Sequence, residues 1–257
     1  NLISKELKKH STNFFPVDSE HFSIFSLIEK NSFKNIEKIY LTASGGPFLN
    51  FSYTKLSNVK MNQALNHPNW KMGKKISIDS ATMMNKVFEV IEAKKIFNLS
   101  YKNIKILIHP KSYIHALVKF NNGLTKILLH EPNMQIPIHN SVYHNDNKEF
   151  KSKDINLKLL NKLDFQTVNL KKFPLVKILN ILPIKDSLFE TVLISINDFF
   201  VSMYLKKKIN YERLIYLINY YANNKIFHKF KKKNPKNVVD IYKTRNYVCA
   251  KLNNSDI

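Results

Sequence analysis

Hydrophobic and polar positions along the chain divide it into two regions of different character. Before residue 143, short apolar runs typical of strands alternate with turns and with one strongly periodic helical segment. From Phe173 onward the apolar spacing is helical, and Pro174 and Pro183 bracket the first short helix. Residues 144–170 begin with polar side chains and lack a sustained period, so we expect a connecting segment there.

Short β-rich runs predict strands at residues 39–43, 76–78, 104–109, 113–120 and 124–129. The strongest helix signal covers residues 80–97, where Met84, Phe88 and Ile91 recur at helical spacing. Later helices are predicted at residues 188–205, 211–222 and 238–252. This order of elements predicts an α/β (α+β) fold, in which a mixed-sheet domain is followed by a C-terminal helical bundle.

Glycine is scarce, because the 257 residues include only Gly45, Gly46, Gly73 and Gly123. A G-x-G-x-x-G dinucleotide site and a G-x-x-x-x-G-K-[ST] phosphate loop are therefore both excluded from this chain. Gly45, Gly46 and Gly73 lie within the motifs described below, which indicates backbone conformations that other residues adopt poorly. The single cysteine, Cys249, excludes an internal disulfide and a multi-cysteine zinc site.

The chain is strongly basic, with a formal net charge of +22. Its lysines are dispersed and arginine is rare, which favours a solvated basic surface over a nucleic-acid site. A basic nucleic-acid or anionic-surface binding protein with an eroded active site is the alternative hypothesis. The longest apolar stretch, residues 188–205, is interrupted by charged and amide side chains, so we expect no membrane-spanning helix.

The first candidate site is the sequence Pro-Val-Asp-Ser-Glu-His, which begins at Pro16. On an extended strand, Asp18 and Glu20 would point to the same side and could converge on one cation. Ligation by carboxylate oxygens suits a hard divalent ion such as Mg²⁺ or Mn²⁺. For this cluster alone, an exposed acidic strand is the more common interpretation.

Two further motifs lie on turns. Ser44-Gly45-Gly46-Pro47 follows a predicted strand and could offer backbone N–H groups and a hydroxyl to an anion, although such a sequence is more often only a turn. The segment from His67 to Gly73 carries Trp70 and Met72 on a polar background. It could form a lid over a ligand, and an ordinary core position for Trp70 is an equal alternative.

The fourth motif opens the strongest predicted helix. Ser80 lies at its expected start, where unsatisfied N–H groups and the helix dipole favour a phosphate. Lys86 would add a charge-assisted donor. Asn85 and Glu89 share a helix face, so Glu89 could be a third carboxylate for the cation. A capped surface helix with a Lys86–Glu89 pair is the alternative.

In this order, the four motifs resemble those of the 1-deoxy-D-xylulose 5-phosphate reductoisomerase family. The matching sequences are Pro-Val-Asp-Ser-Glu-His, Ser-Gly-Gly-Pro-Phe, His-Pro-Asn-Trp-x-Met-Gly and Ile-Asp-Ser-Ala-Thr-Met-Met-Asn-Lys. Shorter matches follow at Ile108-His109-Pro110, Ser112, Ile114-His115 and Glu131-Pro132-x-Met134. The resemblance implies an NADPH- and metal-dependent enzyme, which rearranges 1-deoxy-D-xylulose 5-phosphate and reduces it to 2-C-methyl-D-erythritol 4-phosphate.

The resemblance also implies roles for individual residues. The metal ligands would be Asp18, Glu20 and Glu89, with Mg²⁺ or Mn²⁺ as the ion. The substrate contacts would be Ser19, Glu20, Ser44, His67, Ser80, Asn85, Lys86 and Glu89. Met72 and Gly73 would contact NADPH, and the catalytic residues would be Glu20, Lys86, Glu89 and His115, although a structural role for His115 is at least as common.

By the same resemblance, residues 1–143 are the catalytic metal- and substrate-binding domain, 144–170 the connecting segment and 171–257 the C-terminal helical domain. The family's NADPH-binding Rossmann domain is not within this chain. Val87 stands where the family usually has glycine, and Ile196-Asn197-Asp198 replaces a typical Ala-Asn-Glu. A homodimer, a phosphorylated sugar substrate and a bacterial cytoplasmic or plastid-type location are expected, with neither nucleic acid nor membrane as partner.

Overall fold

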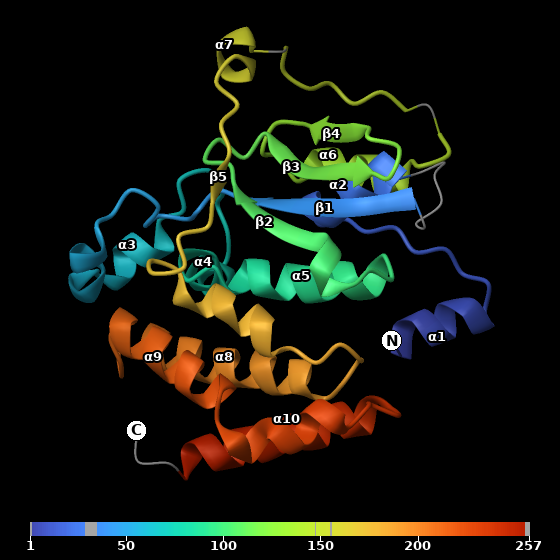
Figure 1. Ribbon diagram of the computed structural model, residues 1–257. Helices are drawn as coiled ribbons and strands as arrows, with labels where there is room; N and C mark the ends of the chain where they lie inside the picture. Colours follow the sequence, from blue (N-terminus) through green and yellow to red (C-terminus); the bar gives the residue numbers. More distant parts are fainter. Residues whose placement is uncertain (1, 29–34, 147, 155, 255–257) are drawn as a thin grey trace. The chain divides into compact units, whose positions relative to one another are not determined.

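The computed structural model describes residues 2–28, 35–146, 148–154 and 156–254 (Figure 1). Contacts group the chain into two compact units, each built from segments that are distant in sequence. The sheet unit comprises Thr12–Gly45 and Glu92–Val168, and the helical unit comprises Asn1–Ser11, Gly46–Ile91 and Asn169–Ile257. The domain boundaries predicted at residues 143 and 170 stay a prediction.

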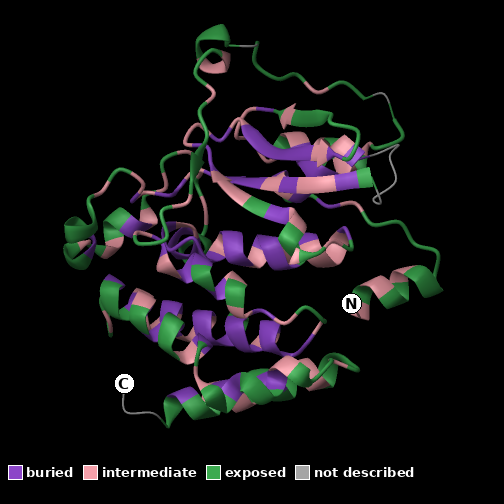
Figure 2. Cartoon of the chain, viewed as in Figure 1, coloured by how far each residue is buried: buried purple, intermediate pink, exposed green. Residues whose placement is uncertain are grey.

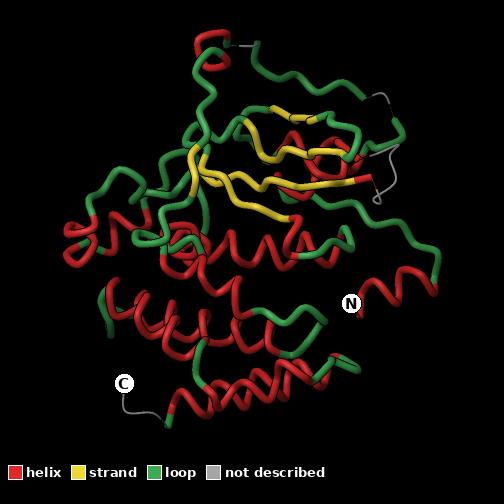
Figure 3. The backbone as a smooth tube through the Cα atoms, in the orientation of Figure 1, coloured by secondary structure: helices red, strands yellow, loops and turns green. Residues whose placement is uncertain are grey.

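The sheet unit is built on a five-stranded sheet of order β4-β3-β1-β2-β5 (Figure 3). β1 runs parallel to β2, and the other neighbours are antiparallel, so the sheet is mixed and the predicted fold class is confirmed. The strands are β1 (Ile36–Ala43), β2 (Ile104–Ile108), β3 (Ile114–Phe120), β4 (Thr125–Leu129) and β5 (Gln166–Thr167). Four of the predicted strands are thus confirmed, with small shifts at their ends.

Helices of the sheet unit cover the strands and complete its core. α2 (Ser19–Ile28) lies against β3 and β4, and α6 (Gln135–Val142) packs on α2. Ile24 of α2 and Ile39 of β1 are fully buried. The short helices η3 (Tyr101–Asn103) and α7 (Leu157–Leu160) complete the unit. Figure 2 shows β1 and β3 mostly buried, whereas the edge strand β4 is mostly exposed.

The helical unit packs around α8 (Phe189–Leu205), which contacts α4, α9, α10 and η5. Phe48, Phe189, Phe200 and Phe227 are buried to 2% exposure or less, and burying such a side chain contributes about 1.5–3 kcal/mol. The other helices are α1 (Leu2–Lys9), η2 (Tyr53–Asn58), α3 (Met61–Leu65), α4 (Lys74–Ala81), η4 (Pro174–Ile181), α9 (Tyr211–Ala222), η5 (Lys225–Lys232) and α10 (Val238–Asn253). α5 (Met84–Ile96) begins in this unit and ends in the sheet unit.

Asparagine caps explain why the C-terminal helices begin where the sequence predicts. The Asn210 side chain accepts a hydrogen bond from the Arg213 amide at the start of α9, and Asn237 accepts one from the Asp240 amide at the start of α10. Each such cap satisfies an N–H group without a helical acceptor and contributes about 1 kcal/mol. The predicted helices at 188–205, 211–222 and 238–252 are confirmed to within one residue.

Two sequence predictions are wrong in the segment before the strongest helix. Residues 76–78 lie within α4 and not in a strand, because three alternating residues are too few to distinguish the two periods. The single helix predicted at 80–97 is interrupted at Thr82 and Met83, and Met83 adopts a left-handed conformation with φ of 63°. Among the residues that the structure describes, no helix combines the length and the apolar character needed to cross a membrane.

We expect Gly46→Ala to destabilise the chain more than Gly123→Ala does. Both glycines have positive φ, which costs an alanine about 1–2 kcal/mol. Only at Gly46 would the added Cβ also meet backbone, at 3.0 Å from the Ser80 carbonyl oxygen, for a total cost of about 2–4 kcal/mol. Urea unfolding of both variants measures the difference, and equal losses would contradict the close approach.

Candidate functional site

The predicted site residues divide between the two units. Asp18, Ser19, Glu20, Ser44 and His115 belong to the sheet unit. The helical unit contains His67, Met72, Gly73, Ser80, Asn85, Lys86 and Glu89. Each group is therefore described within its own unit, and the single cation site expected for Asp18, Glu20 and Glu89 stays a prediction.

Asp18 and Glu20 lie at the start of a helix, so the extended strand predicted for them is wrong. The Asp18 carbonyl accepts a hydrogen bond from the Phe22 amide, which makes Asp18 the residue that precedes the first turn of α2. The Ser19 hydroxyl donates to Glu20 Oε2 over 2.6 Å. Acidic side chains are favoured at a helix N-terminus by the helix dipole, and this explains the conformation.

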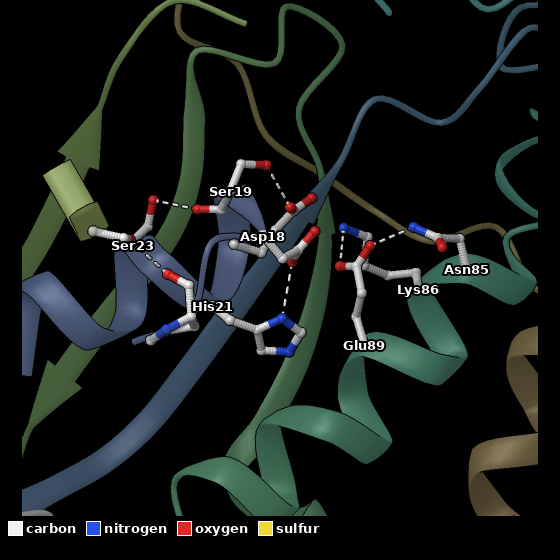
Figure 4. Close-up of polar contacts among 10 residues, drawn as sticks. Asp18, Ser19, His21, Ser23, Asn85, Lys86 and Glu89 are labelled. Atoms are coloured by element: carbon white, nitrogen blue, oxygen red, sulfur yellow. Dashed lines mark hydrogen bonds and ion pairs between the residues drawn. The ribbon is translucent and has the colours of Figure 1, made fainter. Parts of the chain in front are cut away.

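His21 fixes the orientation of the Asp18 carboxylate. Its Nδ1 lies 2.8 Å from Asp18 Oδ2, and its ring is buried and stacked on Phe97 at 6.3 Å between centroids (Figure 4). The Asp18 side chain is 50% exposed, so its carboxylate is held on one side by His21 and open to solvent. Sequence reasoning did not assign a role to His21, although its spacing of three residues from Asp18 would have indicated the contact on a helix.

The Ser-Gly-Gly turn after β1 requires its glycines. Gly45 has φ of 83° and Gly46 φ of 64°, both in the left-handed region, so the predicted need for glycine is confirmed at these positions. At Gly73 this prediction is wrong, because φ is −62° and an added Cβ would meet no atom within 4 Å. Gly73 instead precedes α4, where its carbonyl accepts hydrogen bonds from the Ser77 amide and hydroxyl.

Ser80 lies near the end of α4, and not at the start of a helix as predicted. The chain turns at Thr82 and Met83, the Met83 amide donates to the Ser80 carbonyl, and α5 then begins at Met84. The first turn of α5 therefore contains Asn85 and Lys86, where backbone amides lack acceptors within the helix. An anion at this position would meet the positive end of the α5 dipole.

Glu89 is the centre of a buried polar cluster on α5. Lys86 Nζ donates to Glu89 Oε2 and Asn85 Nδ2 donates to Oε1, so both carboxylate oxygens have partners (Figure 4). Lys86 and Glu89 are each only 5% exposed. A buried charge requires a partner, and the pair provides one for each residue. The alternative considered from the sequence placed the Lys86–Glu89 pair on a helix surface. The pair is present, but the burial of both side chains contradicts that placement.

His67 lies in a loop that lines a cavity of about 630 Å³ together with the rest of residues 65–73. Its Nδ1 accepts hydrogen bonds from the Asn69 and Trp70 amides, at 3.2 and 3.0 Å. Nδ1 therefore carries no proton, and neutral His67 must be protonated at Nε2. Burial lowers the pKa of His67 to about 4, so the ring is a neutral donor at neutral pH. Trp70 is half-buried in the same loop.

His115 is buried within β3 and stacks on His130, with 3.9 Å between ring centroids. His115 Nε2 lies 3.3 Å from the His130 carbonyl oxygen. Burial lowers the pKa of His130, although the Glu131 carbonyl and nearby carboxylates oppose this effect. His130 is a buried polar residue that sequence reasoning missed, because its position at the end of a strand carries no motif of its own.

Two family models match most of the chain. Residues 14–97 match the 1-deoxy-D-xylulose 5-phosphate reductoisomerase C-terminal domain, and residues 129–249 match the DXP reductoisomerase C-terminal domain. The 1-deoxy-D-xylulose 5-phosphate reductoisomerase of Pelagibacter ubique is 54% identical over the whole chain. The same enzyme of Clostridium acetobutylicum is 39% identical over 83% of the chain.

Solved structures agree with the sequence matches. A crystal structure of DOX-P reductoisomerase in complex with NADPH, fosmidomycin and magnesium has a TM-score of 0.86 and 30% identity, and covers 99% of this chain. The chain belongs to the 1-deoxy-D-xylulose 5-phosphate reductoisomerase family. The Zymomonas mobilis enzyme in complex with NADPH has a TM-score of 0.84 at 28% identity and likewise covers 99% of the chain.

This reductoisomerase-family chain spans only part of its relatives. It covers 66% of the Pelagibacter ubique protein and 55% of the Clostridium acetobutylicum protein. Among the solved structures it covers 68% of the magnesium, NADPH and fosmidomycin complex and 65% of the Zymomonas mobilis enzyme. The family predicted from the motifs is confirmed, and the roles of individual residues stay predictions.

We expect His67 of this reductoisomerase-family chain to remain neutral down to about pH 5, protonated at Nε2. Imidazole ¹⁵N–¹H correlation spectra across pH 4–8 report the protonation state, and His67→Gln identifies the signals. Because an unfolded histidine titrates near 6.5, the stability linked to His67 should fall as the pH drops from 6.5 towards 4. A His67 signal that titrates near pH 6.5 would contradict this assignment.

Proposed function

We propose that the chain forms the metal- and substrate-binding part of an enzyme that converts 1-deoxy-D-xylulose 5-phosphate into 2-C-methyl-D-erythritol 4-phosphate with NADPH. The observation that carries the proposal is the hydrogen-bonded Asn85–Lys86–Glu89 cluster at the start of α5, in which Lys86 and Glu89 are buried, together with membership of the family. A lysine and a helix N-terminus suit a phosphate, and a carboxylate beside them suits a cation.

Asp18, Glu20 and Glu89 are the proposed ligands of one divalent cation, Mg²⁺ or Mn²⁺. Three carboxylates form a hard oxygen donor set, which fits either ion and disfavours softer metals. The open side of the Asp18 carboxylate and the partly exposed Glu20 support this role in the sheet unit. When bound, the cation would act as a Lewis acid on adjacent substrate oxygens.

Lys86, Asn85 and Ser80 are the proposed phosphate contacts of the helical unit. Lys86 brings a full positive charge into a buried position, where a charge-assisted hydrogen bond is stronger than at the surface. Glu89 balances that charge when no anion is present. Ser44 and His67 are proposed as further substrate contacts, His67 as a donor through Nε2, and Ser19 as a contact in the sheet unit.

The proposed chemistry requires residues that act on substrate oxygens. Glu20 and Glu89 would act on the substrate oxygens through the bound cation. Lys86 would act through its contact with the substrate phosphate. His115 is proposed as a catalytic residue from the family resemblance, and its stack on His130 supports a fixed ring orientation. Met72 and Gly73 border the cavity of residues 65–73 and are the proposed contacts of NADPH.

We also propose a homodimer in the bacterial cytoplasm or a plastid-type organelle. The edge strand β4 supports association, because Leu124, Ile127 and Leu129 at this edge are 58%, 49% and 37% exposed. An edge strand with exposed apolar side chains is a common pairing surface. The bacterial sources of the relatives support the location. The proposed substrate is a phosphorylated sugar, with no nucleic-acid or membrane partner.

We expect Glu89→Gln to weaken Mn²⁺ binding by at least about tenfold, because the neutral amide removes one of three anionic ligands and each factor of ten corresponds to about 1.4 kcal/mol. Isothermal titration calorimetry of Mn²⁺ into the chain, with a phosphonate hydroxamate present, measures the change. Glu212→Gln, an exposed position on α9, is the matched control and should bind as the parent does. Parent-like affinity of Glu89→Gln would reject the metal assignment.

We expect Lys86→Ala to weaken a phosphonate ligand by about ten- to a hundredfold, since a hydrogen bond to a charged group contributes about 1.5–3 kcal/mol. Lys102→Ala removes an exposed lysine of η3 and should have no effect. A ligand that lacks the phosphonate group should lose little affinity on Lys86→Ala. A double-mutant cycle would measure this coupling between Lys86 and the phosphonate. If both lysine variants bind equally well, the basic-surface alternative is favoured and the phosphate site is rejected.

A further inference from the structure

Ser80 is flanked on both sides by residues that hydrogen-bond to the C-terminal helices of the same unit. The Asp79 side chain, in a residue that is 2% exposed, accepts a hydrogen bond of 2.8 Å at Oδ1 from Asn197 Nδ2 of α8. The Ala81 carbonyl accepts a hydrogen bond of 2.8 Å from the Tyr211 hydroxyl of α9. Contacts from residues more than a hundred positions away therefore meet one short stretch of α4.

The charge of Asp79 is compensated within this cluster. Lys75 Nζ lies 2.8 Å from Asp79 Oδ2 and 3.1 Å from Asp198 Oδ1. Burial raises the pKa of Asp79, and the ion pair with Lys75 opposes that shift. An uncompensated buried carboxylate would be strongly destabilising, so the ion pair with Lys75 helps Asp79 to occupy this buried position. That position brings a directional acceptor next to Ser80.

The third contact comes from the Ser-Gly-Gly turn. A Cβ on Gly46 would lie 3.0 Å from the Ser80 carbonyl oxygen, so the two backbones are in close approach. Met83 follows with φ of 63°, a conformation that costs a residue with a side chain about 1–2 kcal/mol and requires support from its surroundings. The hydrogen bonds at Asp79 and Ala81 lie just before this strained turn.

We propose that Asn197 and Tyr211 are positioning residues, which hold Ser80 and the α4–α5 turn in the geometry that binds the substrate phosphate. The proposal rests on the phosphate site described under the proposed function. Apolar packing of α4 on α8 would bury the helix without fixing its rotation or its end. The hydrogen bonds to the Asp79 carboxylate and the Ala81 carbonyl fix the rotation of α4 and the position of its end, because each bond has a defined direction and length.

Tyr204 provides a matched control for Tyr211. The two rings pack edge to face at 6.2 Å, and both residues are buried. Within the described residues, the Tyr204 hydroxyl has no hydrogen-bond partner, whereas the Tyr211 hydroxyl donates to Ala81. Tyr211→Phe and Tyr204→Phe therefore delete the same atom from neighbouring rings, and only the first deletion removes a contact with α4.

The test measures phosphate and metal affinity separately in the full chain. We expect Tyr211→Phe to weaken inorganic phosphate and a phosphonate hydroxamate by about three- to tenfold, in line with the loss of one buried hydrogen bond. Mn²⁺ affinity without ligand should stay within about twofold of the parent, which corresponds to a difference of about 0.4 kcal/mol in binding free energy. Tyr204→Phe should match the parent for all three probes. Asn197→Ala should reproduce the Tyr211→Phe pattern through the other contact.

Amide hydrogen exchange gives a second readout that requires no ligand. The Thr82 and Met83 amides donate to the Ile78 and Ser80 carbonyls at the end of α4, and the Val87 amide donates to the Met83 carbonyl at the start of α5. We expect their exchange in Tyr211→Phe to be at least about tenfold faster than in Tyr204→Phe, while amides in the middle of α9 exchange alike in both variants. A general loss of stability would instead accelerate exchange throughout the unit.

The outcomes separate this inference from the proposed function. If the parent binds phosphate and Tyr211→Phe binds it equally well, with unchanged exchange at the turn, the positioning role is wrong and the phosphate site stands. If the parent binds Mn²⁺ but neither phosphate nor the phosphonate hydroxamate, the proposed function is wrong and the positioning role falls with it.

Discussion

The turn between α4 and α5 is the constraint on which the phosphate-binding part of the proposed site depends. In one continuous helix, the six steps from Ser80 to Lys86 would correspond to about 600° of rotation, which directs the two side chains to different faces. The interruption at Met83 ends α4 after Ala81 and starts a new helix at Met84. A new helix N-terminus then lies four residues after Ser80, and the positive end of its dipole favours an anion.

Paired buried charges make this arrangement possible. Lys86 and Glu89 neutralise each other on α5, and Lys75 neutralises Asp79 on α4. Lys86, Glu89 and Asp79 are buried, and an isolated charge at any of these positions would be strongly destabilising, whereas the Lys75 side chain is 48% exposed. Lys86 and Glu89 are also the groups that the proposed function requires, since a buried lysine suits a phosphate and a buried carboxylate suits a cation. In each pair, opposite charges lie at hydrogen-bond distance before any ligand binds.

Local signals in the sequence were reliable where one strong pattern covered many residues. The helices α9 and α10 have both a helical apolar period and an asparagine cap, and both were predicted to within one residue. Short patterns failed, because residues 76–78 and the segment around Asp18 are compatible with either period. At Asp18 the deciding factors are the capping position and the contact with His21, which an alternation of two carboxylates does not indicate.

The sequence by itself determined the family, the mixed fold class and the residue types of the candidate site. Ordered motifs and the placement of Gly45 and Gly46 were sufficient, since they depend on residue identity and local backbone conformation. Only the tertiary structure decided that Lys86 and Glu89 are buried, that the helix ends before Met83 and that Asn197 and Tyr211 meet α4. These features depend on contacts between residues that are distant in the chain, and neither periodicity nor propensity contains that information.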